Sequence, residues 1–97
     1  MYTFTNDERQ AIVDAYFASV EPFVLKQFPK KLKKKYAVIE TLATLFKDDT
    51  VYSELDVNEI LKPVWHDYVM LRRFMVDFAL LTRTKDGSEY RKAKTLH

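Results

Sequence analysis

The chain has 97 residues, of which 47% are hydrophobic, and its formal net charge is +2. This length supports one hydrophobic core and one domain, which argues against a multi-domain enzyme. The chain has no cysteine and only two histidines, so disulfides, thiolate nucleophiles and histidine-rich metal sites are excluded. It also lacks a Gly-rich phosphate loop and a nucleophile beside a base, so we expect neither an enzyme nor a cofactor.

Positive charge is concentrated in the last third of the chain. Residues 1–60 carry eight Lys or Arg against ten Asp or Glu, whereas residues 61–97 carry eight against four. Because local patches set the attraction for phosphate, this distribution permits nucleic-acid binding without requiring it. No apolar run approaches the roughly 20 residues that span a bilayer, and the first ten residues lack the features of a signal peptide. We therefore expect a cytoplasmic protein without a membrane partner.

The first predicted element is a helix that begins after Thr5. An acid follows Thr5 at the spacing of a capping box, and apolar residues recur at helical spacing as far as Val20. Phe17 lies off this stripe, so we expect it to contact a partner subunit. Pro22 is predicted to end the helix. Residues 1–27 are thus interpreted as an N-terminal helix and a connector.

A second, longer helix is predicted from Phe28-Pro29 to about Lys47. Pro29 suits the first turn of a helix, and one apolar stripe from Leu32 to Phe46 is expected to be buried. Five lysines crowd the opening turns: Lys30, Lys31, Lys33, Lys34 and Lys35. They form either a solvated face or a patch that contacts phosphate groups, for which the candidates are Lys30, Lys31 and Lys34.

A short extended segment at Thr50–Tyr52 and a compact helix at Glu54–Lys62 follow. Ser53 and Asp56 have the spacing of a capping box at the start of this helix, and Pro63 is predicted to stop it. The helix carries three acids. Because this helix would lie close to a nucleic-acid backbone in a DNA-binding fold, its acids argue against tight DNA binding.

A central helix is predicted to begin after Asp67, which is a favourable cap residue. Five apolar residues share its inner side: Tyr68, Leu71, Phe74, Met75 and Phe78. The outer side carries Val69, Arg73 and Val76, with Arg72 beside them. A helix that contacts bases in a DNA groove is usually more polar, so Val69 and Val76 are candidate residues of an interface with a second protein chain.

A β-hairpin is predicted after the central helix, with strands at Leu81–Thr84 and Glu89–Lys92. The connecting Lys85–Ser88 contains an Asp-Gly pair, and Gly87 is the only glycine of the chain, at the position that most requires a positive φ. Basic side chains line this hairpin: Arg83, Lys85, Arg91 and Lys92. Residues 93–97 are predicted to be a disordered tail.

A helix followed directly by a basic hairpin is typical of a winged helix. We therefore predict a mainly α protein with a small β hairpin, of the α+β class. Its fold would be a winged helix-turn-helix, at residues 28–92, with an extra N-terminal helix.

Five short motifs occur in this order: Phe28-Pro29-x-Lys31, Tyr52-x-Glu54-x-x-Val57-Asn58-x-x-Leu61, Asp67-x-x-x-Leu71-Arg72-Arg73-x-x-Val76-Asp77, Leu81-x-Arg83 and Gly87-x-x-Tyr90. Their joint spacing resembles the bacterial domain of unknown function 2087. The resemblance implies a winged-helix domain found alone or after helix-turn-helix regulators, without an established activity. Two positions depart from the family pattern. Leu55 stands where a polar residue is expected. Phe78-Ala79 replaces the usual Tyr-Gly, so the central helix lacks its usual left-handed glycine.

Two functional hypotheses stay open. The first is a DNA-binding transcriptional regulator, as a homodimer, in which Arg72 and Arg73 approach the major groove. The basic residues of the hairpin and the lysines of the second helix would then contact phosphates. The second is a protein-interaction or oligomerisation module that does not bind DNA and uses Val69, Val76 and Phe17 as its interface.

Three polar residues also have structural interpretations. Arg72 and Arg73 could join Asp67, Asp77 and the acids of the preceding helix in an ion network. An Arg73–Asp77 pair would have the i,i+4 spacing of helix neighbours. For Asn58, a capping or core contact is favoured over base recognition.

Overall fold

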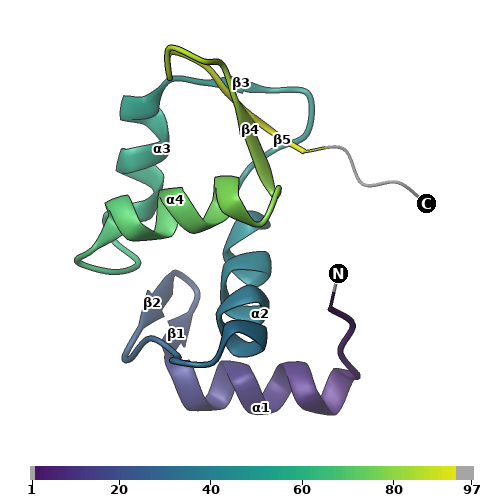
Figure 1. Ribbon diagram of the computed structural model, residues 1–97. Helices are drawn as coiled ribbons and strands as arrows, with labels where there is room; N and C mark the ends of the chain where they lie inside the picture. The colour runs from purple at the N-terminus through teal and green to yellow at the C-terminus, as the bar shows by residue number, and fades with distance from the viewer. Residues whose placement is uncertain (1, 94–97) are drawn as a thin grey trace.

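The computed structural model describes residues 2–93, so residues 94–97 of the predicted tail lie outside the described residues. The described part has an α+β fold with four helices and two small antiparallel sheets (Figure 1). In chain order its elements are α1 (Asn6–Tyr16), β1 (Phe17–Val20), β2 (Phe23–Leu25), α2 (Leu32–Ala43), β3 (Val51–Tyr52), α3 (Glu54–Leu61), α4 (Tyr68–Asp77), β4 (Leu81–Arg83) and β5 (Tyr90–Lys92). Among these helices, none has the length and apolar character needed to cross a membrane.

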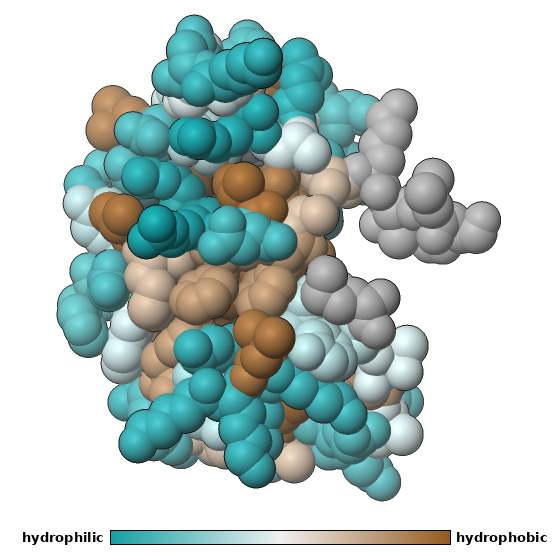
Figure 2. Space-filling view, in the orientation of Figure 1, coloured by the Kyte–Doolittle hydropathy of each residue, from teal (hydrophilic) through white to brown (hydrophobic). Residues whose placement is uncertain are grey.

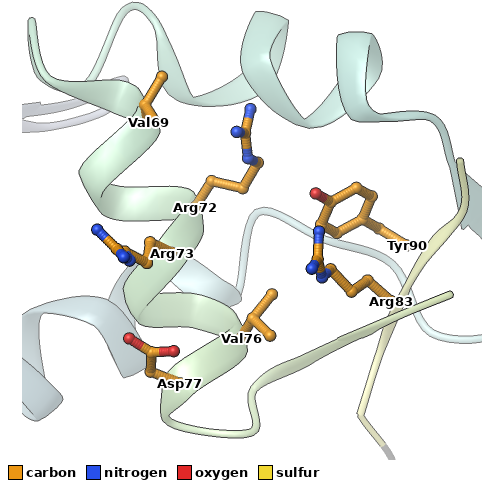
Figure 3. Close-up of a pocket in the computed structure, with 7 residues that line it drawn as sticks. All are labelled: Val69, Arg72, Arg73, Val76, Asp77, Arg83 and Tyr90. Atoms are coloured by element: carbon orange, nitrogen blue, oxygen red, sulfur yellow. The ribbon is translucent and has the colours of Figure 1, made fainter. Parts of the chain in front are cut away.

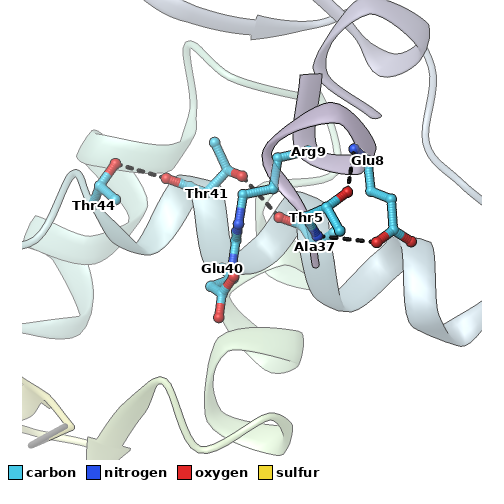
Figure 4. Close-up of polar contacts among 7 residues, drawn as sticks. All are labelled: Thr5, Glu8, Arg9, Ala37, Glu40, Thr41 and Thr44. Atoms are coloured by element: carbon cyan, nitrogen blue, oxygen red, sulfur yellow. Dashed lines mark hydrogen bonds and ion pairs between the residues drawn. The ribbon is translucent and has the colours of Figure 1, made fainter. Parts of the chain in front are cut away.

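The predicted cap of the first helix is confirmed. The Thr5 side-chain oxygen accepts a hydrogen bond from the Glu8 backbone N–H at 3.1 Å, and the Glu8 carboxylate accepts one from the Thr5 N–H at 3.0 Å. The resulting α1 lies against α2, and Figure 4 shows Arg9 of α1 reaching Glu40 of α2. The Arg9 Nη1 and Glu40 Oε1 atoms are 2.6 Å apart, so an ion pair joins the N-terminal helix to α2.

The prediction that the first helix continues to Val20 was wrong. The helix ends at Tyr16, and the strands β1 and β2 then form an antiparallel hairpin around a cis peptide bond before Pro22. Aromatic and branched apolar residues on both sides of the proline favour paired strands over another helical turn. This composition was the sequence signal for the hairpin.

The hairpin also corrects the expected role of Phe17. Its side chain is only 6% exposed, its backbone pairs with Leu25, and its ring centroid lies 5.5 Å from that of Phe23. Because Phe17 is buried in the core of its own chain, it cannot present an interface to a second subunit.

The helix α2 is shorter than predicted and lies at the centre of the core. It begins at Leu32, so Pro29 precedes it, and it ends at Ala43. Ile39 and Leu42 are fully buried, as predicted for the apolar stripe. Leu32 was predicted to be buried with them, but it is exposed because it lies in the first turn of the helix. One continuous core cluster joins α2 to buried residues of α1, the hairpin, α3, α4 and the three-stranded sheet.

A row of aromatic rings connects the segment before α2 to α4. The ring centroids of Phe28 and Phe74 lie 5.9 Å apart, those of Phe74 and Phe78 5.5 Å apart, and those of Phe78 and Tyr36 5.3 Å apart. Aromatic pairs at such distances contribute beyond simple burial. In Figure 2, hydrophobic colour crosses the middle of the visible face, between more hydrophilic upper and lower regions.

The next two predicted caps are also confirmed. Ser53 and Asp56 form a capping box at the start of α3, and Asp67 accepts a hydrogen bond from the backbone N–H of Met70 at 3.1 Å. The strands after α4 join β3 in a sheet of order β3-β5-β4, in which Tyr90 pairs with both Tyr52 and Arg83. This sheet places the β4–β5 hairpin beside α4.

Two left-handed residues shape the chain around β4. Ala79 has a φ of 59°, so this alanine adopts the conformation that a glycine would favour at the end of α4. The Leu80 N–H then donates to the Met75 carbonyl at 2.8 Å and closes the helix end. Gly87 has a φ of 73°, as predicted for the hairpin turn.

Candidate nucleic-acid interface

A basic groove lies between α4 and the β4–β5 hairpin. Its volume is about 350 Å³. Figure 3 shows Arg72 and Val76 on the side of α4 that faces α3 and the two strands, whereas Arg73 and Asp77 extend from the other side of α4. Three arginines, one aspartate, two valines and one tyrosine line it: Arg72, Arg73, Arg83, Asp77, Val69, Val76 and Tyr90. The charged side chains of this lining sum to a formal charge of +2, so the groove would attract an anion.

Arg72 is held by residues of α3. Its guanidinium donates a hydrogen bond to the Asn58 side-chain oxygen at 2.5 Å and lies 3.6 Å from the Glu54 carboxylate, and its side chain is 19% exposed. Figure 3 shows Arg72 extending from α4 toward α3. These contacts match the structural interpretation of Arg72 and the capping or core interpretation of Asn58.

Glu54 connects three elements around the groove. Besides approaching Arg72, its carboxylate accepts a hydrogen bond from the Tyr90 hydroxyl at 3.1 Å. Glu54 begins α3 and Tyr90 begins β5, so this carboxylate links α3 to both α4 and the hairpin. Sequence reasoning missed the link to Tyr90, because the two residues are 36 positions apart and nothing local to either one signals the contact.

Arg73 is in a different position from Arg72. Its side chain is exposed and, in Figure 3, it extends from α4 away from the hairpin, whereas Val76 points toward the hairpin. Within residues 2–93, no ion pair involves Arg73, so the predicted pair with Asp77 is not formed. The guanidinium of Arg73 therefore remains available to a ligand.

The basic residues of the hairpin fall into two groups. Arg83, Lys85 and Arg91 are exposed, and the part of the chain that the structure describes contains no ion-pair partner for them. The Lys92 ammonium instead lies 3.9 Å from the Asp48 carboxylate. Three of the four predicted cations thus face solvent without a protein partner in the described chain.

The turn of the hairpin is organised by Asp86. Its Oδ1 atom accepts hydrogen bonds from the Thr84 hydroxyl at 2.7 Å, the Ser88 hydroxyl at 2.8 Å and the Ser88 backbone N–H at 3.0 Å. These bonds, above all the one from Thr84, lower the pKa of the Asp86 carboxyl to about 2. The carboxylate is therefore charged at neutral pH and orders the turn that carries the basic side chains.

Apolar side chains lie at the edges of the basic groove. Val69, in the first turn of α4, is 49% exposed, and Val76 is half-buried. Leu55, which departs from the polar residue expected of the family, is 65% exposed on α3. Val69 and Val76 therefore add apolar surface to the lining of the groove, whereas Leu55 is not among its lining residues.

The predicted lysine candidates do not line this groove. Lys30, Lys31 and Lys34 line a separate cavity of about 280 Å³ beside the start of α2. Lys33 lies 3.9 Å from Glu8, and the Lys35 ammonium lies 5.3 Å from the centre of the Phe74 ring. Among residues 2–93, no group of three or more His, Cys, Asp or Glu side chains could hold a metal ion.

The family described as an uncharacterized protein conserved in bacteria, DUF2087, matches residues 24–92. The chain belongs to this family. The DUF2087 match extends from β2 to β5 and so includes every residue of the basic groove, whereas α1 and β1 precede it. No curated protein and no solved structure matches the chain. The DUF2087 description states no activity.

Proposed function

We propose that the chain is a winged-helix DNA-binding domain of a bacterial transcriptional regulator. The order α2-β3-α3-α4-β4-β5 supports this proposal, as does a sheet of order β3-β5-β4 that places a hairpin beside the last helix. In helix-turn-helix proteins the second helix of the motif enters the major groove of DNA. By this comparison α4 is the recognition helix and the β4–β5 hairpin is the wing.

The basic groove between α4 and the wing is the observation that carries the proposal. Two of its three arginines, Arg73 and Arg83, form no ion pair with another residue of the described chain. An arginine fork can donate two hydrogen bonds to a guanine edge or to a phosphate. We assign Arg73 to contact with the base edges, because its side chain extends from the exposed face of α4. Arg72 instead positions α4 on α3.

The wing would supply contacts to the DNA backbone. Arg83, Lys85 and Arg91 are exposed on it and carry three positive charges. Each phosphate contact releases counterions from the DNA. A plot of the logarithm of the association constant against the logarithm of salt concentration should therefore steepen by about 0.9 for each contact. Backbone contacts of this kind set affinity and register, whereas base contacts set sequence preference.

A salt titration tests this assignment. Fluorescence anisotropy with a labelled mixed-sequence duplex, at several salt concentrations, should show binding that weakens as salt rises. The double variant Arg83→Ala/Arg91→Ala should bind more weakly, with a salt slope smaller by about 2. The variant Lys47→Ala, which removes an exposed charge that does not line the groove, should keep the wild-type slope. No binding of the wild type at low salt would overturn the proposal.

A protein-interaction module is the second candidate, and the exposed valine of α4 favours it. Val69 and the half-buried Val76 both line the groove, two helical turns apart, and the neighbouring α3 carries Leu55 and three acids. Light scattering should then show an oligomer that Val69→Asp dissociates. Val20→Asp is the matched control, because Val20 is also 49% exposed but lies on the β1–β2 hairpin. A mass that does not change in Val69→Asp would count against this candidate.

A further inference from the structure

A second cavity lies outside the proposed DNA-binding groove and shares no residue with it. Its volume is about 280 Å³. Three elements meet there: the end of α1, the segment between β2 and α2, and the first turn of α2. Seven residues line it: Tyr16, Gln27, Phe28, Pro29, Lys30, Lys31 and Lys34.

The cavity lies in the most positively charged stretch of the chain. Residues 22–39 contain six lysines and no acid. Lys33 and Lys35 are engaged with Glu8 and with the Phe74 ring, respectively. The other four, Lys26, Lys30, Lys31 and Lys34, are exposed, and no ion pair of the described residues involves them. Such a cluster would attract several negative charges at once.

Aromatic rings complete the lining. Tyr16 and Phe28 are half-buried, and the ring of Phe28 stacks on that of Phe74, which does not line the cavity. The Gln27 amide is fixed by its hydrogen bond to the Ala15 carbonyl, with an Nε2–O distance of 2.8 Å. An acidic peptide would use the lysines alone, whereas a nucleotide offers a phosphate for the lysines and a base that can stack on the rings of the cavity.

We infer that this cavity binds single-stranded nucleic acid, with a base against Tyr16 and Phe28 and the adjoining phosphates on Lys30, Lys31 and Lys34. The lysine ammonium is a compact positive charge that lacks the fixed paired donors of an arginine guanidinium. Every base has a flat face that can stack on an aromatic ring. The site is therefore expected to accept single strands of any base sequence. It works independently of duplex binding by α4 and the wing.

Fluorescence anisotropy with a labelled 12-nucleotide oligo(dT) tests the inference. The variant Lys30→Ala/Lys31→Ala/Lys34→Ala should bind at least about tenfold more weakly at low salt, with a salt slope smaller by about 2, because single strands lose about 0.7 per contact. Phe28→Leu should weaken binding about fivefold or more through lost stacking. Tyr16→Leu is a second aromatic variant, and thermal melting of each variant checks that it folds.

Two controls separate this site from the proposed DNA groove. Arg83→Ala/Arg91→Ala should bind duplex more weakly but bind oligo(dT) like the wild type. Lys47→Ala should also bind oligo(dT) like the wild type. The inference is overturned if the wild type does not bind oligo(dT) at low salt, or if the lysine variant binds it unchanged. Competition by poly-glutamate as effective as that by unlabelled oligo(dT) would also overturn it, because charge alone would then explain binding. Failure of duplex binding would contradict only the proposed function.

Discussion

Arg72 of α4 donates a hydrogen bond to Asn58 of α3, with 2.5 Å between its Nη1 atom and the Asn58 Oδ1 atom. The contact joins two helices through side chains that are both partly buried. Hydrogen bonds to charged groups contribute about 1.5–3 kcal/mol to stability, and a partner left behind carries a desolvation penalty. Arg72 is thus a residue that holds α4 in place, in contrast to its exposed neighbour Arg73.

Replacement of Asn58 should therefore destabilise the fold. Asn58→Ala leaves the Arg72 guanidinium with only the more distant Glu54 carboxylate, and we expect the free energy of unfolding to fall by about 1–2 kcal/mol. Urea denaturation measures this change. Arg73→Ala is the control and should change stability by less than about 0.5 kcal/mol, because the side chain is exposed. Equal effects of the two substitutions would contradict the assigned roles.

Glycine at position 79 should stabilise the protein. Ala79 has a φ of 59°, and a residue with a Cβ atom is strained in this left-handed region by roughly 1–2 kcal/mol. Because glycine also loses more entropy on folding, we expect Ala79→Gly to raise the free energy of unfolding by about 0.5–1 kcal/mol. Thermal melting would detect the gain.

A glycine in a right-handed helix provides the opposite control. Ala37 lies within α2, where Ala37→Gly should lower stability by about 1 kcal/mol or more. A loss of stability in Ala79→Gly as well would show that the left-handed conformation of Ala79 carries no strain.

Alanine at position 87 should weaken the β4–β5 hairpin. Gly87 has a φ of 73°, whereas an added Cβ atom would meet the Arg83 guanidinium nitrogen only at 3.4 Å, which is ordinary contact. The expected loss of about 1 kcal/mol thus comes from backbone conformation. Gly87→Asn should cost less, since asparagine tolerates the left-handed region better. Chemical denaturation of the two variants distinguishes this cause from steric conflict, which would make asparagine the worse residue.

The Asp86 carboxyl should titrate near pH 2. Its pKa is lowered from 3.8 by hydrogen bonds from the Thr84 hydroxyl and from Ser88, so the folded state binds the proton less tightly than the unfolded state. The contribution of Asp86 to stability is therefore full above about pH 4 and is lost as pH falls through about 2. Carbon NMR of the carboxyl group can follow the titration.

Removal of the Thr84 hydroxyl tests the cause of this pKa. In Thr84→Val, the Asp86 pKa should move back toward 3.8, because the strongest of its hydrogen bonds is lost. An Asp86 pKa that stays near 2 in this variant would assign the shift to Ser88 alone.

The helix caps and the hairpin glycine could be predicted from sequence because each depends on residues close together in the chain. Thr5 with Glu8, Ser53 with Asp56, and Asp67 with Met70 are three residues apart, so their spacing alone specifies the contact. Periodicity likewise located α2, α3 and α4, although α2 proved shorter at both ends.

The β1–β2 hairpin was missed because its residues fit two local patterns. Ala18 and Val20 continue the helical spacing of α1, but pairing with β2 and burial of Phe17 favour a strand. Strand pairing depends on partners several residues away, which helical periodicity does not register.

The composition of the candidate sites was visible in the sequence, and their geometry was not. The chain by itself determined an α+β class, the capped helices, the basic hairpin and the clustered lysines, because these follow from local spacing and charge. Only the tertiary structure decided that Arg72 is held by Asn58 while Arg73 remains available, and that the lysines line a cavity that shares no residue with the basic groove. The physical reason is that these contacts join side chains from different elements, whose mutual placement is set by packing of the shared core.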